Sequence, residues 1–538
     1  MKIKLFFLAI TLFLFINYIS AQDKSDWKGG VPEGCTTITV GKKASADGSV
    51  MTSHTDDSHK TRSWMNIIPA KDYKKGSVET MYKRTSLDSF AMKTYKHTPI
   101  GNIPQVKHTY KFVNTAYPSM NEHQLAIGES TFGGREELVS NVGLIDCQRL
   151  CKLMLERCTT AREAIKTAGE LTKKYGWIDE GECLTIADKK EVWHFEIVGM
   201  GKGKKGAVWV AQRVPDDEVS VNANASRIRK INLEDENYFM ASENIYSVAK
   251  ENNWWNGNKN DFEFCYAYAP KSRTSVAARR REWRVLSLFA PSLNIHPEDE
   301  NYPFSVKPEK KVTVQDVINV FKDYFEGTPY DMTRNIITYD KNGNKKISPL
   351  ANPFLPYDQL EISNVSGGWY HVSKDGSVEF LGERTIARWY TMYGTITQSR
   401  DWLPDDIGGV LWLAQDNIAT SIYVPVYCGT TDLPKSYKTP GRVNGFTRES
   451  AWWAFNRLGT LTAQRWGDMR HDVDAVWKPL QTKMFEDQAN YEKKALNIKN
   501  KKDLHKYLTN YTLEKGETVV KKAWDLGDFL WTKYDEKF

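Results

Sequence analysis

The sequence predicts an α+β protein, in which a mixed body of strands and helices carries a helical C-terminal region packed on it. Short runs with the two-residue period of strands alternate with stretches of helical period between residues 36 and 426. Beyond Arg448 the periodicity is helical only, and tryptophan is dense there. No internal repeat interrupts this order, so a repeat architecture is not expected.

The first segment is predicted to lie outside the fold. Lys2 and Lys4 precede an apolar run over 5–16, and Ala21 follows at a small-residue exit. A basic start, a short apolar stretch and a small residue before the cut are typical of a secretory signal peptide, here residues 1–21. The run is short for a membrane span, which needs about 20 apolar residues. We therefore expect an exported protein, periplasmic or secreted, with no membrane association after cleavage; an uncleaved N-terminal anchor is the alternative.

Residues 22–34 are polar, rich in Gly and Pro and without periodicity, which predicts a linker or a prosegment removed on activation. A strand is then predicted over 36–40 and a returning strand over 50–53. The Asp47-Gly48 pair between them favours a hairpin turn.

The remaining elements follow from the same two periods. Strands are expected over 124–128, 183–186, 192–197, 207–210, 219–221, 410–413 and 421–426. Helices are expected as two short segments over 147–174, then over 313–325, 451–497 and 517–535.

The composition is that of a globular protein. The 538 residues are 41% hydrophobic and 26% charged, which excludes intrinsic disorder. The net charge of +7 results from 74 Lys and Arg against 67 Asp and Glu, so no basic stripe for nucleic acid is expected. The seven cysteines are an odd number, which raises the question of whether one thiol serves chemistry.

Several short motifs resemble functional sites but are better explained structurally. The G-x-G-x-x-G pattern at 201–206 has strand-like residues on both sides, which predicts a basic hairpin loop. Residues 340–345 begin like a calcium loop but lack its Gly and its closing Glu, which predicts a polar turn. No H-E-x-x-H, C-x-x-C or G-x-S-x-G pattern occurs, so neither a metal site nor a serine nucleophile is expected, and no cofactor is predicted. Three cysteines near one face of a predicted helix are expected to be buried structural thiols: Cys147, Cys151 and Cys158.

Cys35 carries the strongest chemical signal, because it stands at the junction between the prosegment and the first strand. Cleavage between Gly34 and Cys35 would place a thiol and a free α-amine on one residue. An α-amine has a pKa of about 7.7–8.0, so it can accept the thiol proton and later return it to a leaving amine. A disulfide at Cys35 is the structural alternative, and a lipidated cysteine is disfavoured because residues 31–34 are not apolar.

The residues around Cys35 resemble a known family. The block 34–49 is similar to the opening of peptidase family C69, the dipeptidase A-like cysteine dipeptidases of the N-terminal nucleophile hydrolase superfamily. Further similar blocks are 130–136, 219–228, 280–285, 397–404 and 423–429. The resemblance implies an αββα sandwich over 35–447, a helical region over 448–538 packed on it, and hydrolysis of dipeptides without a cofactor.

The resemblance also implies roles for single residues. Cys35 matches the nucleophile, and Asp57 matches a carboxylate that orients the α-amine. His54 occupies a position close to the thiol where related enzymes often carry Arg. Asn224 matches an oxyanion-hole amide, with a capping or turn Asn as the alternative. Arg281 matches a basic residue that supports the site, with a surface cation as the alternative.

Two residues are assigned to the substrate. Thr131 stands where bile-salt hydrolase relatives carry Asn, so a second side-chain oxyanion donor is not expected there, although its backbone N–H could serve. A dipeptide presents an ammonium and a carboxylate, so its pocket needs an acidic and a basic partner. We predict Glu129 for the ammonium, because it follows a strand that reaches the cleft; the basic partner stays open.

Two functions other than that of a dipeptidase remain open. One is a related amidase that cleaves acyl amides such as bile-acid conjugates or penicillin V. The other is a secreted binding protein whose aromatic residues form a ligand surface, although most aromatic residues belong to cores. The sequence leaves open side-chain preference, assembly into a homo-oligomer and the state of the other six cysteines.

Overall fold

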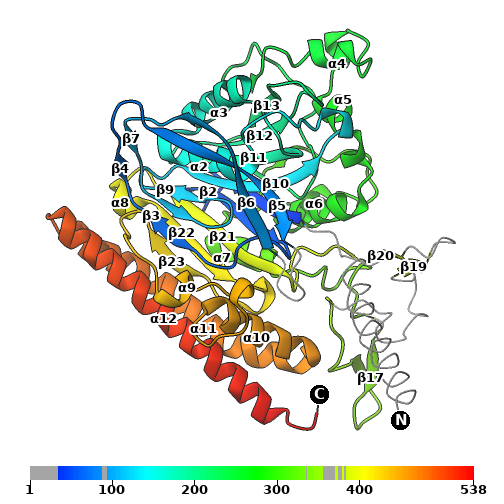
Figure 1. The fold of residues 1–538 in the computed structure, drawn as a ribbon. Coiled ribbons are helices and arrows are strands. Elements are labelled where there is room, and N and C mark those ends of the chain that lie inside the picture. Colours follow the sequence, from blue (N-terminus) through cyan, green and yellow to red (C-terminus); the bar gives the residue numbers. More distant parts are fainter. Residues whose placement is uncertain are drawn as a thin grey trace, which may run out of the picture.

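The computed structural model describes residues 34–87, 94–334, 336–354, 370–372, 378–380 and 383–537. The predicted signal peptide and all of the predicted prosegment except Gly34 lie outside these residues, so they remain predictions. The described chain contains two large antiparallel sheets and two groups of helices (Figure 1). The predicted α+β class is therefore confirmed.

Seven strands form the sheet that carries Cys35. Their order across the sheet is β16 (Ser305–Val306), β14 (Val219–Asn222), β1 (Gly34–Val40), β2 (Val50–Asp57), β21 (Thr391–Ser399), β22 (Val410–Gln415) and β23 (Val424–Tyr427). The predicted hairpin is confirmed, since β1 pairs antiparallel with β2 and Asp47 accepts hydrogen bonds from Ser49 in the turn. Because β1 and β2 are central, Cys35 lies inside the molecule.

Eight strands form the second sheet. Their order is β15 (Phe239–Ala241), β13 (Val208–Arg213), β12 (Val192–Val198), β11 (Gly181–Ala187), β10 (Ala126–Gly133), β9 (Met120–Asn121), β8 (Phe112–Asn114) and β3 (Asn66–Ile68). Shorter pairs complete the described strands: β4 (Lys71–Asp72) with β7 (His108–Thr109), β5 (Val78–Leu87) with β6 (Thr94–Pro104), β17 (Ile337–Tyr339) with β18 (Lys345–Ile347), and β19 (Tyr370–Val372) with β20 (Val378–Phe380). The predicted polar turn and basic hairpin loop are also present, between β17 and β18 and between β12 and β13.

The two large sheets pack face to face, and part of the interface between them is polar. Thr52 of β2 and Thr185 of β11 share a hydrogen bond of 2.6 Å, and Thr39 of β1 lies 3.1 Å from Nε2 of His194 in β12. The approach is closest at Gly128, where a Cβ atom would lie 2.4 Å from the carbonyl oxygen of Ser53. Only glycine allows the two backbones to come so near.

Helices cover the outer face of each sheet. The helices are α2 (Cys147–Arg157), α3 (Ala161–Tyr175), α4 (Ser247–Glu251), α5 (Phe264–Tyr268), α6 (Val276–Phe289), α7 (Val314–Phe321), α8 (Asp405–Gly408), α9 (Lys435–Lys438), α10 (Ala451–Gln464), α11 (Trp466–Leu496) and α12 (Lys501–Lys533). Helix α3 packs on β11 and β12, whereas α6, α7, α10 and α12 pack on strands of the seven-stranded sheet. In Figure 1, α2 and α3 lie on one side of the strands and α10–α12, coloured orange to red, on the other.

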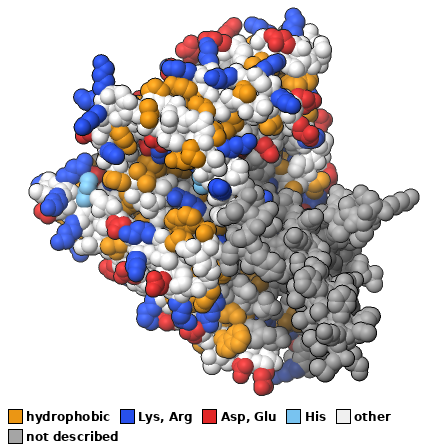
Figure 2. All heavy atoms as spheres, viewed as in Figure 1, with side chains coloured by type: hydrophobic (Ala, Val, Ile, Leu, Met, Phe, Trp, Pro, Cys, Tyr) orange, Lys and Arg blue, Asp and Glu red, His pale blue; other side chains and the backbone are white. Residues whose placement is uncertain are grey.

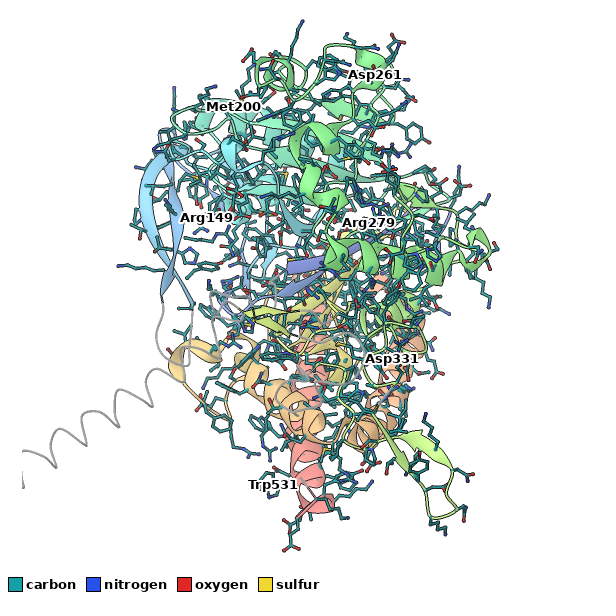
Figure 3. All side chains as sticks on the ribbon, turned by 90° about the vertical axis from the view of Figure 1, so that its right-hand side faces the viewer. Arg149, Met200, Asp261, Arg279, Asp331 and Trp531 are labelled. Atoms are coloured by element: carbon teal, nitrogen blue, oxygen red, sulfur yellow. The ribbon has the colours of Figure 1, made fainter. Side chains whose placement is uncertain are left out.

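The C-terminal region differs from the prediction in its boundaries. The single helix expected over 451–497 is two helices, because Arg465 adopts a non-helical conformation (φ −145°, ψ 57°) between α10 and α11. Helix α12 begins at Lys501 rather than 517, since Asn500 caps it by accepting from the N–H groups of Lys502 and Asp503. Figure 3 shows Trp531 of α12 at the opposite end of the molecule from Met200.

All seven cysteines are buried and none forms a disulfide. The burial predicted for Cys147, Cys151 and Cys158 is confirmed, and the disulfide alternative for Cys35 is wrong for this structure. Figure 2 shows cationic and anionic side chains interspersed over the visible face. Within the described ranges, no helix combines the length and the apolar character needed to cross a membrane.

Candidate active site

A cavity of about 450 Å³ opens where the ends of β1 and β2 meet the ends of β10 and β11. Cys35 lines it, although the residue itself is only 5% exposed. The other lining residues are Gly34, Asp56, Asp57, Ser58, Thr61, Arg84, Tyr95, Tyr117, Thr131, Phe132, Gly133, Asp179, Glu180, Glu182 and Asn224. Cavity-lining carboxylates therefore outnumber the single arginine.

The backbone of Cys35 is fixed by two predicted site residues. Its N–H donates to Oδ1 of Asn224 at 3.0 Å, and its carbonyl oxygen accepts from Nη1 of Arg281 at 2.8 Å. Arg281 also donates to Oδ1 of Asn224 at 2.9 Å, so one guanidinium group joins both residues. Arg281 is 2% exposed, which excludes the surface-cation alternative.

Asn224 is held from several sides. Its backbone adopts a left-handed conformation (φ 63°), which Asn tolerates better than most residues. Its backbone N–H donates to the Ser130 hydroxyl oxygen at 2.9 Å, and its side-chain amide donates to the carbonyl oxygen of Thr131 at 2.7 Å. The second N–H of that amide donates to no other described residue, and the side chain lines the cavity.

The thiol of Cys35 faces the second sheet. Its Sγ donates to Oε2 of Glu129 at 3.1 Å, and Nε2 of His54 lies 3.3 Å from the same oxygen. Burial raises the pKa of the Cys35 thiol well above its usual value, and the charge of Glu129 adds to this effect. The thiol is therefore protonated while its backbone nitrogen is still part of the Gly34–Cys35 peptide bond.

Glu129 and Glu182 share this part of the site as a buried pair of carboxyl groups. The hydroxyl of Thr131 donates to Glu129 at 3.0 Å and to Glu182 at 2.8 Å. Burial and then repulsion from Glu129 raise the pKa of Glu182. Burial acts in the same direction on Glu129, but His54, Glu182 and Cys35 outweigh it and lower the pKa of Glu129. The pair therefore carries one negative charge, which resides on Glu129.

Asp57 lies directly opposite Gly34 in the β1–β2 register. Arg384 donates to its Oδ2, and the Thr391 hydroxyl donates to its Oδ1 at 2.5 Å. The structure thus brings all seven predicted site residues to one end of the sheets, and their chemical roles remain predictions.

Sequence reasoning missed four residues of this site. Arg384 and Glu182 bind predicted residues, whereas Asp56 and Arg84 line the cavity. No local sequence pattern marks Arg384, Glu182 or Arg84, because strand pairing and loop packing bring them to the site. Asp56 could have been found, since it lies two residues from His54 on the same strand face.

Three side chains could hold a metal ion, since donor atoms of Cys35, His54 and Glu129 all lie within 4.8 Å of one another. A second set with the same spacing is Glu129, Cys147 and Glu182. Both sets are buried. In the first, Glu129 already contacts Cys35 and His54; in the second, Glu129 and Glu182 both accept from the Thr131 hydroxyl. The sequence contains no metal-binding motif that would favour one of them.

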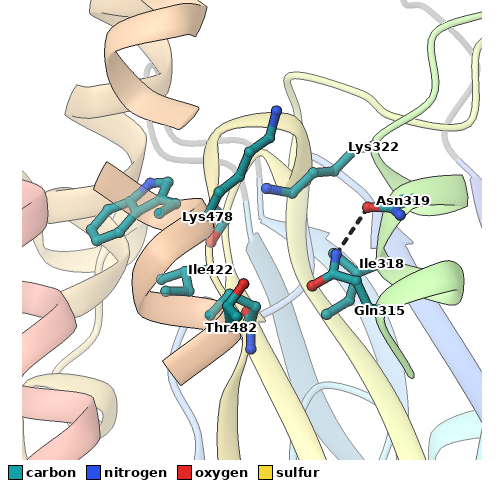
Figure 4. A pocket seen from close by; sticks show the side chains of 10 residues that line it. Gln315, Ile318, Asn319, Lys322, Ile422, Lys478 and Thr482 are labelled. Atoms are coloured by element: carbon teal, nitrogen blue, oxygen red, sulfur yellow. Dashed lines mark hydrogen bonds between the residues drawn. The ribbon is translucent and has the colours of Figure 1, made fainter. Parts of the chain in front are cut away.

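A second cavity, of about 270 Å³, lies between α7 and α11 (Figure 4). It is lined by Gln315, Ile318, Asn319, Lys322, Ser421, Ile422, Trp477, Lys478, Gln481 and Thr482. These side chains include no thiol and no carboxylate, so the cavity at Cys35 is the better candidate for chemistry.

The chain is similar in sequence to known proteins over most of its length. The sequence profile described as peptidase family C69 matches residues 34–479. The chain is 25% identical over 451 residues to a probable dipeptidase of Latilactobacillus sakei, covering 82% of this chain and 83% of that protein. It is 25% identical over 410 residues to probable dipeptidase B of Lactococcus lactis (75% and 76% covered), and 22% identical over 446 residues to dipeptidase A of Lactobacillus helveticus (82% and 83% covered). Since the profile spans most of the chain and includes every predicted site residue, the protein belongs to peptidase family C69.

Proposed function

We propose that this protein is an exported cysteine dipeptidase that is activated by cleavage between Gly34 and Cys35. In this proposal, residues 35–447 are the catalytic domain with the sandwich of N-terminal nucleophile hydrolases, and 448–538 pack on it. The names of the relatives support dipeptides as the substrate class. The family match, which begins at Gly34, supports Cys35 as the first residue of the working enzyme.

The observation that carries the proposal is the position of both functional groups of Cys35. Its thiol and its backbone nitrogen lie at the same cavity, the nitrogen 3.0 Å from Oδ1 of Asn224. Cleavage at Gly34–Cys35 would convert this held amide nitrogen into an α-amine at nearly the same place. The base would then be fixed next to the nucleophile with no separate residue to position it.

The reaction follows from these positions. The α-amine takes the thiol proton, directly or through a water, while sulfur attacks the dipeptide carbonyl carbon and its oxygen becomes an oxyanion. The free N–H of the Asn224 amide and backbone N–H groups would stabilise that charge. The C–N bond then breaks, and the α-ammonium returns its proton to the departing amino acid. Water attacks the thioester and gives a proton to the α-amine. The C–S bond then breaks, the first amino acid leaves, and the thiolate takes the proton back from the α-ammonium.

Asp57 and Arg281 would act in this scheme without touching the substrate. Asp57 faces Gly34 across the strand pair, where its carboxylate can orient the α-ammonium that replaces the peptide bond. Arg281 holds the Cys35 carbonyl and the Asn224 side chain in one geometry.

The intact mass and the N-terminal residue of the active protein test the proposal. We expect a chain that starts at Cys35 and hydrolyses dipeptides, and Cys35→Ala should lower activity by roughly 10³-fold or more. Cys158→Ala is the matched control, because Cys158 is buried away from the cavity and should leave activity near the parent level. An active sample that starts at Gln22 would contradict the mechanism, because the α-amine would be far from the thiol.

A further inference from the structure

Two carboxylates of the cavity, Asp56 and Glu182, have a buried oxygen without a hydrogen-bond partner among the described residues. Asp56 is 2% exposed, and its Oδ2 makes no hydrogen bond to any residue in the described part of the chain. Buried carboxylates normally have hydrogen-bond or ion-pair partners, because removing an ionised carboxylate from water is costly. An unpartnered oxygen that lines a cavity therefore indicates that a ligand completes its surroundings.

Asp56 stands next to the nucleophile. Cys35 and Asp56 are directly opposite each other in the antiparallel register of β1 and β2. Partners of this kind project from the same sheet face with Cβ atoms about 4.5–5.5 Å apart. Since Cys35 faces the second sheet through its bond to Glu129, Asp56 faces the same space.

The distance suits the amino terminus of a dipeptide. In such a substrate, two bonds separate the ammonium nitrogen from the scissile carbonyl carbon, which is about 2.5 Å. Sulfur must approach that same carbon, so whatever binds the ammonium must lie within one side-chain length of Cys35. Asp56 meets this condition because of the strand register alone.

The other buried carboxylates near the thiol are already engaged. Glu129 contacts Cys35 and His54, and Asp57 binds Arg384. Glu182 accepts from Thr131 through Oε1. Its Oε2 is unpartnered as well, but burial and repulsion from Glu129 raise the pKa of Glu182, which disfavours the charged form that an ammonium would need. Asp56 is thus the buried carboxylate with the most binding capacity left for a substrate.

The charge of the cavity also favours a cation. Among the described residues that line it, Arg84 is the one Lys or Arg, and its guanidinium is paired with Asp179 and lies 3.3 Å from Asp146. Burial raises the pKa of Asp56 to about 7, against the charge of His54, while the charges of Glu129 and Asp57 add to the increase. A bound ammonium would favour the ionised form of this carboxyl group.

We infer that Oδ2 of Asp56 binds the α-ammonium group of the dipeptide and so restricts hydrolysis to substrates with a free amino terminus. This inference rests on the proposed function, in which sulfur of Cys35 attacks the adjacent carbonyl. It gives Asp56 the contact that the sequence suggested for Glu129, which here holds the thiol.

The test compares Asp56→Asn with the parent on three substrates: Ala-Ala, N-acetyl-Ala-Ala and p-nitrophenyl acetate, an activated ester with no ammonium. We expect Asp56→Asn to lower kcat/KM for Ala-Ala by about 10- to 100-fold, the range expected for a lost charge-assisted hydrogen bond. The ester rate should change less than threefold, so the preference for a free amino terminus should shrink by the same 10- to 100-fold.

Two further variants keep the result interpretable. Glu180→Gln removes a carboxylate from the exposed edge of the same cavity, and an equal loss there would show a general charge effect and overturn the inference. Asp56→Glu keeps the charge and should recover part of the Ala-Ala activity, which also serves as the test if the Asn variant does not fold.

The remaining outcomes separate this inference from the proposed function. Equal loss on dipeptide and ester in Asp56→Asn would assign Asp56 to the thiol rather than to the substrate, and would overturn the inference. A dipeptide-specific loss in Glu129→Gln with none in Asp56→Asn would return the role to Glu129. A parent enzyme that starts at Cys35, cleaves the ester and ignores dipeptides would overturn both.

Discussion

At the scale of single residues, Arg281 donates through its two Nη atoms to four acceptors from two separate parts of the chain. It donates to the Cys35 carbonyl, the Thr36 hydroxyl, the Ala223 carbonyl and Oδ1 of Asn224, at 2.8 to 3.1 Å. Arginine suits this position because its planar fork offers five donors in fixed directions. One guanidinium group therefore holds both Cys35 and Asn224 in place.

Arg281→Lys should show whether Arg281 positions Cys35 and Asn224 or contacts the substrate. A lysine ammonium cannot reach all four acceptors, and each buried acceptor left unpaired costs about 1–3 kcal/mol. We expect kcat to fall by about 10- to 100-fold and KM to change less than threefold, because Arg281 does not line the cavity. Steady-state kinetics on Ala-Ala, with urea unfolding in parallel, measure both effects.

Arg280→Lys is the control for Arg281→Lys, since Arg280 neighbours it on α6 but pairs with Glu383 instead. It should keep kcat within threefold of the parent. A rise in KM with unchanged kcat in Arg281→Lys would mean that Arg281 serves binding, contrary to the support role.

The residues of the site differ in how far the sequence could reveal them. Cys35 was predictable as a candidate because the predicted prosegment ends and a strand begins there, and Asn224 and Arg281 because their surroundings resemble a family. Glu182 was not, since its contact with Thr131 depends on the pairing of β10 with β11. Arg384 lies far along the chain from Asp57, and only the folded structure brings the two together.

At the scale of elements, α11 is tied to the seven-stranded sheet by a buried ion pair. Both guanidinium Nη atoms of Arg400, which follows β21, donate to the carboxylate of Glu492 at 2.8 and 2.9 Å. The Tyr427 hydroxyl of β23 donates to the same carboxylate at 3.1 Å. One glutamate on α11 thus holds the ends of two strands.

Glu492→Gln should therefore destabilise the whole protein. An amide cannot balance the buried charge of Arg400, and breaking a buried pair from one side costs about 3–5 kcal/mol. We expect the free energy of unfolding to fall by that amount in urea titrations, with activity retained in the fraction that is folded.

Glu486→Gln on the same helix is the matched control, because Glu486 is exposed and the change should stay within about 0.5 kcal/mol. Equal stability of Glu492→Gln and Glu486→Gln would show that α11 does not depend on the Arg400 pair.

Local signals explain which elements were predictable. The hairpin of β1 and β2 follows from an Asp-Gly turn between two strand-like runs, and the two helices over 147–174 follow from their period. The break between α10 and α11 was missed because no Gly or Pro stands at Arg465. Conversely, Pro479 lies inside α11 without ending it, so tertiary packing overrides the local preference there.

At the scale of the whole molecule, buried carboxyl groups couple folding to pH. Burial raises the pKa to about 7 for Asp56, Glu196 and Asp416. Between the unfolded pKa of about 4 and this folded value, the folded state binds protons that the unfolded chain has released. The free energy of unfolding therefore decreases as pH rises through that window, by up to about 1.4 kcal/mol per pH unit for each group.

Asp416→Asn isolates one of these contributions at a position remote from the active-site cavity. Asp416 is 2% exposed, accepts from Asn456 of α10 at 2.9 Å and has a left-handed backbone (φ 56°), which asparagine also tolerates. Because the amide does not titrate, the decrease in unfolding free energy between pH 4 and pH 7 should be shallower than in the parent. The variant should thus gain stability relative to the parent as pH rises, which urea unfolding at pH 5, 6, 7 and 8 measures.

Asp261→Asn, at an exposed aspartate (Figure 3), is the control and should leave the dependence of unfolding free energy on pH as in the parent. Parallel curves for Asp416→Asn and the parent would show that Asp416 is already ionised in the folded protein throughout this range.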